Sequence, residues 1–264
     1  MRNLWASNTG RNPSIGWGGV FNFVNNVVFN WQHRTADGGD YTMMCNFINN
    51  YYKPGPATPR DKPIAYRIVN PEGRSGKMLP WRQFGRVYAS GNIVEGNPQV
   101  TLDNWAGGIQ LTDKDGYQGT NDDMLMMRSD EPFVMAPLTV MDAGETLSWV
   151  LQNVGATLPC RDIVDQRVID EVRTGLFRHR HLPNDSYKQG IITDPRQMGG
   201  YPEYGAWTPY VDSDMDGMPD EWELLHGLNP NDPSDANADF NGDGYTNIEK
   251  YINGTGADVR YAKQ

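Results

Sequence analysis

Residues 2–31 read RNLWASNTGRNPSIGWGGVFNFVNNVVFNW, and part of this stretch returns later in the chain. The segment NFVNNVV at residues 22–28 is followed 24 residues later by NFINNYY at residues 46–52. The shared pattern, an Asn followed by two large apolar or aromatic residues, begins at Asn3, Asn26, Asn50 and Asn92. Because its spacings are 23, 24 and 42 residues, the pattern predicts a supersecondary unit that repeats and stacks on its neighbours.

The composition of these repeats indicates which unit stacks. The segments are short, rich in β-branched and aromatic residues and separated by Gly and Asn, which is typical of strands and turns. Coils of this length predict an all-β fold, a right-handed parallel β-helix. Asn at one corner of successive coils can form a ladder of side-chain hydrogen bonds, and Asn tolerates the left-handed turn that such a corner needs. A β-sandwich with Asn-rich turns is the alternative.

The pattern divides the chain into four parts. We predict β-helix coils over residues 1–135, with a Pro-rich lateral loop at residues 53–86 and short strands continuing after it. A helical cap and a segment that wraps the coils are expected at residues 136–210. An acidic module follows at residues 211–253, and residues 254–264 form a tail.

Two helices are expected in the cap. Asp142 with Glu145 three residues later is an N-terminal capping pattern, and apolar residues then recur at helical spacing up to Gly155. A second amphipathic pattern covers residues 161–174. We expect both helices to pack against the coils.

Charge is distributed unevenly. Residues 1–86 contain 11 Lys or Arg and four acidic residues, whereas residues 211–253 contain 11 acidic residues and one Lys. A basic surface on the coils suits a polyanionic substrate. Nothing in the chain resembles a nucleic-acid-binding signature, and no apolar run is long enough to predict a membrane span.

The acidic module carries two loops with the spacing of calcium ligands. In the first loop, positions 1, 3, 5, 9 and 12 are acidic, Gly217 stands at position 6, and Met218 offers its backbone carbonyl. Its predicted ligands are Asp212, Asp214, Asp216, Met218, Asp220 and Glu223. The second loop departs at position 12, which is Lys250, so Glu249 is considered as a substitute. Its predicted ligands are Asp239, Asn241, Asp243, Tyr245, Asn247 and Glu249. A plain acidic linker is the alternative.

The two loops resemble the thrombospondin type 3 or dockerin-like calcium repeats. The helices expected at residues 221–225 and 248–252 are too short to be stable alone. We therefore expect Ca2+ at extracellular concentration to order the module.

Cys45 and Cys160 are the only cysteines. We expect Cys45 to be a buried, reduced thiol, and a bridge to Cys160 is the alternative. The chain starts directly in a coil without a signal-peptide pattern, and a β-helix normally has more coils. We therefore expect the chain to begin part-way through a β-helix.

The first third also resembles the pectate lyases of polysaccharide lyase family 1. The likeness rests on NLWASN at residues 3–8, then Arg11 and Pro13, then the pair Asn25-Asn26. Gly18 also matches the family pattern, whereas Gly16 stands where the family has a second Arg and Arg2 where it has a His. Further likeness runs through residues 104–108, 159–175 and 199–204, so it covers most of the chain.

The resemblance implies β-elimination on polygalacturonate or pectin, assisted by calcium. Arg11 matches the family's catalytic Arg, which removes the C5 proton or acts electrostatically; the alternative is a surface Arg at a coil corner. No residue here matches the family's calcium-binding aspartates, so we expect this chain alone to be catalytically incomplete. The resemblance further implies a secreted, periplasmic or cell-surface protein, and we expect a monomer. A non-catalytic carbohydrate-binding β-helix and a calcium-stabilised structural or adhesive module are the alternatives.

Overall fold

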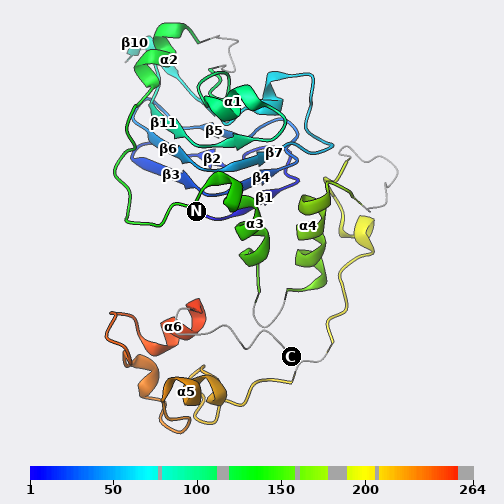
Figure 1. Cartoon of the computed structure of the whole chain (residues 1–264), viewed down its shortest axis with the longest axis vertical. Helices are drawn as coiled ribbons and strands as arrows, with labels where there is room; N and C mark the ends of the chain where they lie inside the picture. Colours follow the sequence, from blue (N-terminus) through cyan, green and yellow to red (C-terminus); the bar gives the residue numbers. More distant parts are fainter. Residues whose placement is uncertain (77–78, 112–118, 158–160, 178–188, 206–207, 255–264) are drawn as a thin grey trace. The chain divides into compact units, whose positions relative to one another are not determined.

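The protein is described here by a computed structural model that covers residues 1–76, 79–111, 119–157, 161–177, 189–205 and 208–254. The chain divides into two compact units. The coil unit contains residues 1–157 and 161–201, and the acidic unit contains residues 202–264. Each unit is described separately below (Figure 1).

The coil unit is built on three parallel sheets, and Figure 1 shows the strands of successive coils stacked within them, for example β3, β6 and β11. The first sheet contains β1 (Leu4–Ala6), β4 (Val27–Phe29), β7 (Tyr51–Lys53) and β12 (Ile93–Val94). The second contains β2 (Ser14–Ile15), β5 (Ala36–Gly38) and β8 (Val69–Pro71). The third contains β3 (Val20–Val24), β6 (Met44–Ile48) and β11 (Arg86–Ser90). Because successive coils supply neighbouring parallel strands, the arrangement fits the predicted parallel β-helix and not an antiparallel sandwich.

The predicted Asn ladder is present and has one more rung than predicted. The side-chain amide of Asn26 donates to Oδ1 of Asn50 at 3.0 Å, and that of Asn50 donates to Oδ1 of Asn92 at 2.8 Å. Asn3 joins at the start, and Asn104 accepts from Asn92 at 2.8 Å at the other end. The buried rungs bond one another, so burying their amides leaves few polar groups unpaired.

The left-handed corner lies one residue before the ladder, which corrects the sequence-based assignment. Asn25 has φ 51° and Asn49 has φ 49°, and Gly91 takes the same place with φ 68°. The side-chain amides of Asn25 and Asn49 each donate to the carbonyl of Met141 at 2.8 Å. In each Asn pair, the first residue therefore makes the turn and the second forms the ladder.

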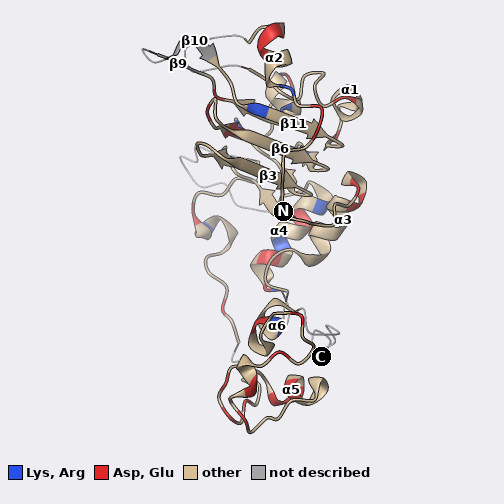
Figure 2. Cartoon of the chain, turned by 90° about the vertical axis from the view of Figure 1, so that its left-hand side faces the viewer, with Lys and Arg blue, Asp and Glu red and all other residues tan. Residues whose placement is uncertain are grey.

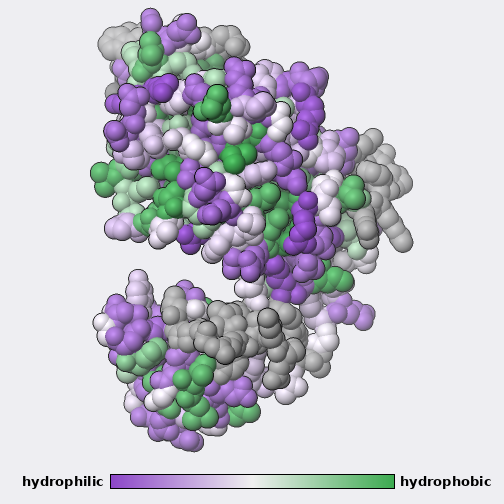
Figure 3. All heavy atoms as spheres, viewed as in Figure 1, coloured by the Kyte–Doolittle hydropathy of each residue, from purple (hydrophilic) through white to green (hydrophobic). Residues whose placement is uncertain are grey.

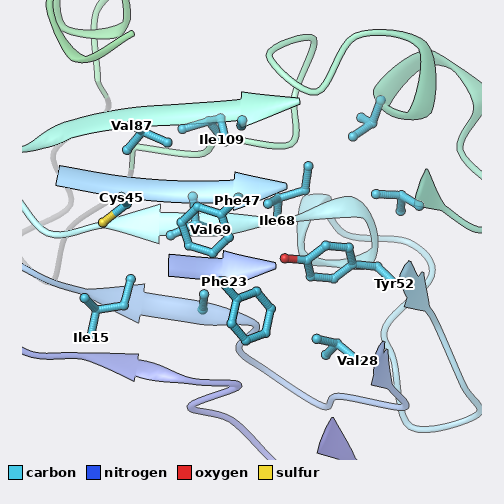
Figure 4. Packing of buried hydrophobic residues seen from close by; sticks show 14 of the residues in the cluster. Ile15, Phe23, Val28, Cys45, Phe47, Tyr52, Ile68, Val69, Val87 and Ile109 are labelled. Atoms are coloured by element: carbon cyan, nitrogen blue, oxygen red, sulfur yellow. The ribbon is translucent and has the colours of Figure 1, made fainter. Parts of the chain in front are cut away.

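The interior of the coils is filled by apolar side chains that point inward from the sheets (Figure 4). Phe23 and Phe47 lie on neighbouring strands of the third sheet with ring centroids 5.7 Å apart. Tyr52 is fully buried with its ring edge-on to Trp31. Cys45 is a free, buried thiol of the same core, as predicted, whereas Cys160 lies outside the described residues.

The segment predicted as a lateral loop, residues 53–86, contains a strand of the coil. Strand β8 pairs in parallel with β5, so the chain completes its second sheet here. The excursions lie on either side of β8: a turn with the short helix η1 (Pro63–Tyr66) and an antiparallel pair, β9 (Arg74–Gly76) and β10 (Leu79–Gln83). The strand was not predicted because the segment is rich in proline, and β8 itself ends in Pro71.

The strands predicted over residues 87–135 stop at β12. Two short helices follow, α1 (Pro98–Leu102) and α2 (Asn121–Met127). Asn97 caps α1, and Thr120 with Asp123 forms a capping box for α2. Isolated parallel bridges from Ile109 to Val69 and from Arg128 to Val87 continue two of the sheets.

The two helices predicted for the cap are present as α3 (Ala143–Asn153) and α4 (Ile163–Thr174). Asp142 caps α3 as predicted, and Asp162 caps α4, which ends at Gly175 in the left-handed conformation. Both helices cover the outer face of the first sheet, where Val150 and Val172 pack in one cluster with Phe29. A short helix, η2 (Pro195–Met198), lies in the segment predicted to wrap the coils.

The surface of the coil unit is chemically mixed. On the face shown in Figure 3, hydrophilic and hydrophobic side chains are interspersed over this unit. None of the described helices combines the length and apolar character needed to cross a bilayer.

Candidate functional site

The acidic unit is held by a small core around Trp222. Its elements are α5 (Asp220–His226), η3 (Asp235–Asn237) and α6 (Asn247–Asn253). Met218 is fully buried and packs with Trp222, whose ring lies 5.4 Å from that of Tyr251 on α6. Acidic residues are frequent in the loops that lead into these helices (Figure 2).

The first loop brings carboxylates together in two overlapping groups. Asp212, Asp214 and Asp216 form one group, and Asp216, Glu223 and Asp235 form the other. In each group, one carboxylate oxygen per residue lies within 4.8 Å of the others. Four of these residues belong to the predicted calcium loop.

Asp235 was not predicted as a member of this site. It lies 12 residues after Glu223, in η3, and therefore outside the 12-residue loop pattern. The sequence contains no spacing rule for a ligand supplied by the connecting segment. Only the fold of the unit brings Asp235 to the first loop.

The backbone shapes the first loop around its carboxylates. The amides of Asp216 and Gly217 donate to the two oxygens of Asp212 at 3.2 and 3.0 Å, and Met218 N donates to Asp216 Oδ1 at 2.8 Å. Gly217 has φ 97°, which a residue with a Cβ adopts only with strain. These contacts turn the remaining oxygens inward.

Several of the inward oxygens lack a hydrogen-bond donor. Among the described residues, none donates to Asp214 Oδ2, Asp216 Oδ2, Asp235 Oδ1 or either carboxylate oxygen of Glu223, and all of these atoms are buried. Glu223 is fully buried, and unpaired buried charge of this kind is costly. A cluster of oxygen donors is what a hard metal ion requires, so this centre could hold such an ion.

The electrostatic environment of Glu223 also favours a bound cation. Burial, followed by the charges of Asp216, Asp214 and Asp235, raises the pKa of Glu223 to about 7. Burial, together with the charges of Asp214, Asp212 and Asp235, raises the pKa of Asp216, whereas the hydrogen bond from the Met218 amide acts in the opposite direction. Both shifts show that the site has more negative charge than its surroundings stabilise, and a cation would relieve that excess.

Two of the predicted ligands of the first loop differ in their placement. Met218 lies in the loop, fully buried, beside Asp216. Asp220 is turned away from the carboxylate groups: its two oxygens accept hydrogen bonds from the amide and the hydroxyl of Ser213, both at 2.7 Å. Asp220 therefore ties the start of α5 to the loop.

The second loop is arranged around a side chain of the protein. The ammonium of Lys250, which is 1% exposed, lies 2.5 Å from Asp239 Oδ1 and 2.9 Å from Asp243 Oδ1, and it also donates to the carbonyl of Tyr245. The hydrogen bond from Lys250 is the main reason why the pKa of Asp239 falls to about 2. Phe240 covers the ammonium, with its ring centroid 5.1 Å from Nζ.

The other predicted ligands of this loop make hydrogen bonds within the unit. Asn241 donates from Nδ2 to Asp243 Oδ2 at 3.1 Å. Asn247 is buried, accepts from the amide of Phe240 and donates to the carbonyl of Asp235. Glu249 forms a capping box with Thr246 at the start of α6. Its carboxylate is thus used at the helix N-terminus.

A row of arginines marks the coil unit. The strand register places Ser14 opposite Asp37 and Asp37 opposite Asn70 in the second sheet. Arg11, Arg34 and Arg67 each precede one of these residues by three positions, so they occupy the same position in three successive coils. Neighbouring coils lie about 4.8 Å apart. We call these three residues the arginine row.

The members of the row differ in environment. Arg11 is exposed and has φ 60°. Arg34 forms an ion pair with Asp37 at 2.8 Å, and Arg67 donates from Nε to Gln110 Oε1 at 2.7 Å. Burial lowers the pKa of Arg67, and the charge of Asp37 acts in the opposite direction. Sequence reasoning found Arg11 but missed the row, because the excursion before β8 breaks the spacing.

A cleft of about 740 Å³ adjoins the row. Its described lining includes the basic residues His33, Lys62 and Arg67, together with Tyr66 and Gln110. Gly10, the neighbour of Arg11, lies close to the next coil: a Cβ at this position would be 3.1 Å from side-chain atoms of His33 and Arg34. The cleft meets the arginine row at Arg67, and its basic lining can attract a polyanion.

Sequence comparisons give this region a context. No protein-family model matches the chain. A protein of Aspergillus flavus named probable pectate lyase C is 30% identical over 258 residues, which is 96% of this chain and 52% of the relative. Proteins of the same name from Aspergillus terreus and Emericella nidulans are 28% and 29% identical over 260 and 256 residues, each again covering 96% of this chain. In those two relatives, the matched part is 52% and 51% of the length.

The chain thus spans about half the length of the curated relatives it matches. The matched region covers 96% of this chain, so it extends over most of both units. By sequence, the chain is therefore similar to about half the length of proteins named probable pectate lyase C.

Proposed function

We propose that the chain acts in a pectate lyase, with the arginine row as a binding surface for polygalacturonate and the acidic unit as a calcium-binding module. The observation that carries this proposal is the strand register that puts Arg11, Arg34 and Arg67 at one coil position. A polymer with a carboxylate on every sugar suits a row of guanidinium groups, because each group can donate two hydrogen bonds to a carboxylate. The similarity to proteins named pectate lyase supports the same substrate.

The proposed reaction is a β-elimination. A base removes the proton from C5 of a uronate, the electron pair forms the C4–C5 double bond, and the C4–O bond breaks while the oxygen of the leaving sugar takes up a proton from water. Negative charge develops on the uronate carboxylate as the proton leaves. Arg11 is placed in this role because it is exposed at the head of the row, where a fixed guanidinium stabilises such charge. Calcium, when bound to the uronate, would acidify the same proton.

The calcium module is proposed from its donor set. Asp212, Asp214, Asp216, Glu223 and Asp235, with the carbonyl of Met218, would hold one Ca2+ through oxygen atoms only. Calcium modules of extracellular proteins bind in the range of about 10⁻⁴ to 10⁻³ M. We accordingly propose that the protein acts outside the cytoplasm or at the cell surface, where Ca2+ reaches that concentration.

Binding of polygalacturonate to the purified chain tests the proposal. Calorimetric titration should show binding that weakens as salt is raised, since the contacts are ionic. Arg34→Gln should weaken it at least about tenfold, because it removes a charge from the row. Arg173→Gln is the matched control: Arg173 is exposed on α4, paired with Asp170, and lies outside the row.

Absorbance of the unsaturated uronate, measured in the same samples with Ca2+ and with chelator, reports turnover. Binding together with product favours a lyase whose site is complete in this chain. Binding without product agrees with the expected catalytic incompleteness, and it equally fits a non-catalytic carbohydrate-binding β-helix. Equal binding of wild type and Arg34→Gln would contradict the role of the row.

A further inference from the structure

The inward oxygens of the two acidic loops differ in their partners. In the first loop, the inward oxygens of Asp214, Asp216 and Glu223 have no donor among the described residues. In the second, oxygens of Asp239, Asp243 and Tyr245 all contact the ammonium of Lys250. The loops therefore share a ligand spacing but differ in what neutralises them.

Lys250 occupies a particular position in the loop pattern. Counted from Asp239, it is the twelfth residue, where the first loop has Glu223. Its contacts, Asp239, Asp243 and the Tyr245 carbonyl, are at positions 1, 5 and 7, three positions that supply oxygens to a calcium ion in such loops. The side chain that replaces the closing carboxylate thus places its own positive charge among the ligands that remain.

We propose that Lys250 is a covalently attached substitute for calcium in the second loop, so that the acidic unit binds one calcium ion, in the first loop, and uses the second loop to hold Asp235 in that site. This inference rests on the calcium site proposed above for the first loop. It keeps Asp235 as a ligand of the first loop. It removes all predicted ligands of the second loop from the calcium ligand set: Asp239, Asn241, Asp243, Tyr245, Asn247 and Glu249.

An ammonium and a calcium ion cannot share the second loop. The buried Nζ already lies within hydrogen-bond distance of two carboxylates, so a divalent ion there would meet a positive charge at close range in a poorly solvated place. Glu249, the further carboxylate that could offset this repulsion, is committed at the start of α6, where it accepts from Thr246 N and Oγ1 at 2.8 Å.

The second loop is connected to Asp235 through Asn247. Asn247 Nδ2 donates to the carbonyl of Asp235 at 2.8 Å, and Asn247 Oδ1 accepts from Phe240 N at 2.9 Å. On the side chain of Asp235, Oδ2 accepts from the amide of Asn229 at 2.9 Å, which leaves Oδ1 facing the carboxylates of Asp216 and Glu223. A loop neutralised by its own lysine can keep this brace in place at any calcium concentration.

Calcium stoichiometry of the full chain, measured by calorimetry without polysaccharide, tests the inference. Asp216→Ala should bind one ion fewer than wild type, whereas Asp239→Asn and Glu249→Gln should bind the same number as wild type. If Asp216→Ala binds as many ions as wild type, the proposed calcium site in the first loop fails. If Asp239→Asn binds one ion fewer while Asp216→Ala also loses one, the first site stands and the role of Lys250 fails.

The substitution Lys250→Glu should create a second calcium site, because it restores a carboxylate at position 12 and removes the ammonium. The variant should bind one more ion than wild type, and Asp239→Asn should remove the gain. A folded Lys250→Glu protein, checked by circular dichroism, that binds no further ion would overturn the inference. The stoichiometries of Asp216→Ala, Asp239→Asn and Glu249→Gln decide the matter even if this variant does not fold.

Asp235 is tested in the first site. Asp235→Asn should weaken calcium binding at least about tenfold, since it loses the charge of a direct ligand and outer-shell changes alone typically cost about 10–100-fold. Asp232→Asn is the matched control, because its carboxylate caps Ser234 and belongs to neither carboxylate group. Equal loss of affinity in both variants would mean that only overall charge matters, which would contradict the role of Asp235 as a ligand.

Discussion

The side-chain amide of Asn50 donates a hydrogen bond to Oδ1 of Asn92 at 2.8 Å, although 42 residues separate the two in the chain. Asn50 is fully buried and also accepts two hydrogen bonds from Asn26 and donates one to the carbonyl of Phe23. One side chain therefore satisfies polar groups of two neighbouring coils.

Asn50→Ala should consequently be strongly destabilising. Each buried group left without a partner costs about 1–3 kcal/mol, so we expect the free energy of unfolding in urea to fall by about 3 kcal/mol or more. Asn153→Ala, at the exposed end of α3, is the control and should change it by less than about 0.5 kcal/mol. A small loss at Asn50 would mean that the ladder is not a source of stability.

Cys45 should resist thiol reagents in the folded protein. Burial raises the pKa of its thiol to about 12, so only a fraction on the order of 10⁻⁴ is thiolate at pH 8, and the sulfur lies inside the coils. A Cys160→Ser variant isolates its signal. We expect labelling only after unfolding by guanidinium. Rapid labelling under native conditions would show that the coils open locally at β6.

The acidic unit should respond to pH in opposite directions with and without calcium. The pKa of Glu223 is raised to about 7 in the folded unit, so between pH 4.5 and 7 the folded state binds more protons than the unfolded state. In chelator, the stability of this unit should therefore decrease as pH rises through that range. With calcium, it should increase, because the ion must displace the proton.

Thermal unfolding of the acidic unit, followed at pH 5, 6 and 7 in chelator and in calcium, measures this crossover. Glu223→Gln should reduce the decrease seen in chelator, since this group no longer titrates. Parallel curves in the two buffers would contradict the placement of Glu223 in the ion site.

Arg11→Lys should reduce turnover by about a hundredfold or more while it affects binding less. The substitution keeps the charge but loses the planar fork that holds a carboxylate in register. The measurement requires a form that turns over polygalacturonate, either this chain or the chain preceded by further coils. Arg173→Lys serves as the control, and unchanged kcat in Arg11→Lys would remove Arg11 from the chemistry.

Local sequence signals predicted the coil architecture well. The Asn ladder and the two cap helices follow from spacing and capping residues such as Asp142, which act within a few residues or one coil. The sequence did not reveal Asn104, because the helix α1 intervenes and shortens its spacing from Asn92 to 12 residues. Strand β8 was hidden for a similar reason, between two excursions.

The candidate sites were predicted only as far as their residues are contiguous in the sequence. The first acidic loop was recognised because Asp212 to Glu223 lie in 12 successive residues, whereas Asp235 reaches it through the packing of η3. The arginine row required the register of three strands. From the sequence, Lys250 was interpreted only as the absence of a ligand at position 12. The sequence pattern does not show that its long side chain reaches the carboxylate of Asp239.

The ammonium of Lys250 also makes the second loop independent of the calcium concentration. A dissolved ion occupies its site according to its concentration, but a tethered charge has an effective concentration set by the length of its own side chain. Dilution, chelation or a calcium-poor medium cannot remove it. In such a medium, the carboxylates of the second loop would stay neutralised by Lys250, whereas those of the first loop would lack their calcium ion. Protection from proteolysis should accordingly be lost first around Asp212 and last around Asp239.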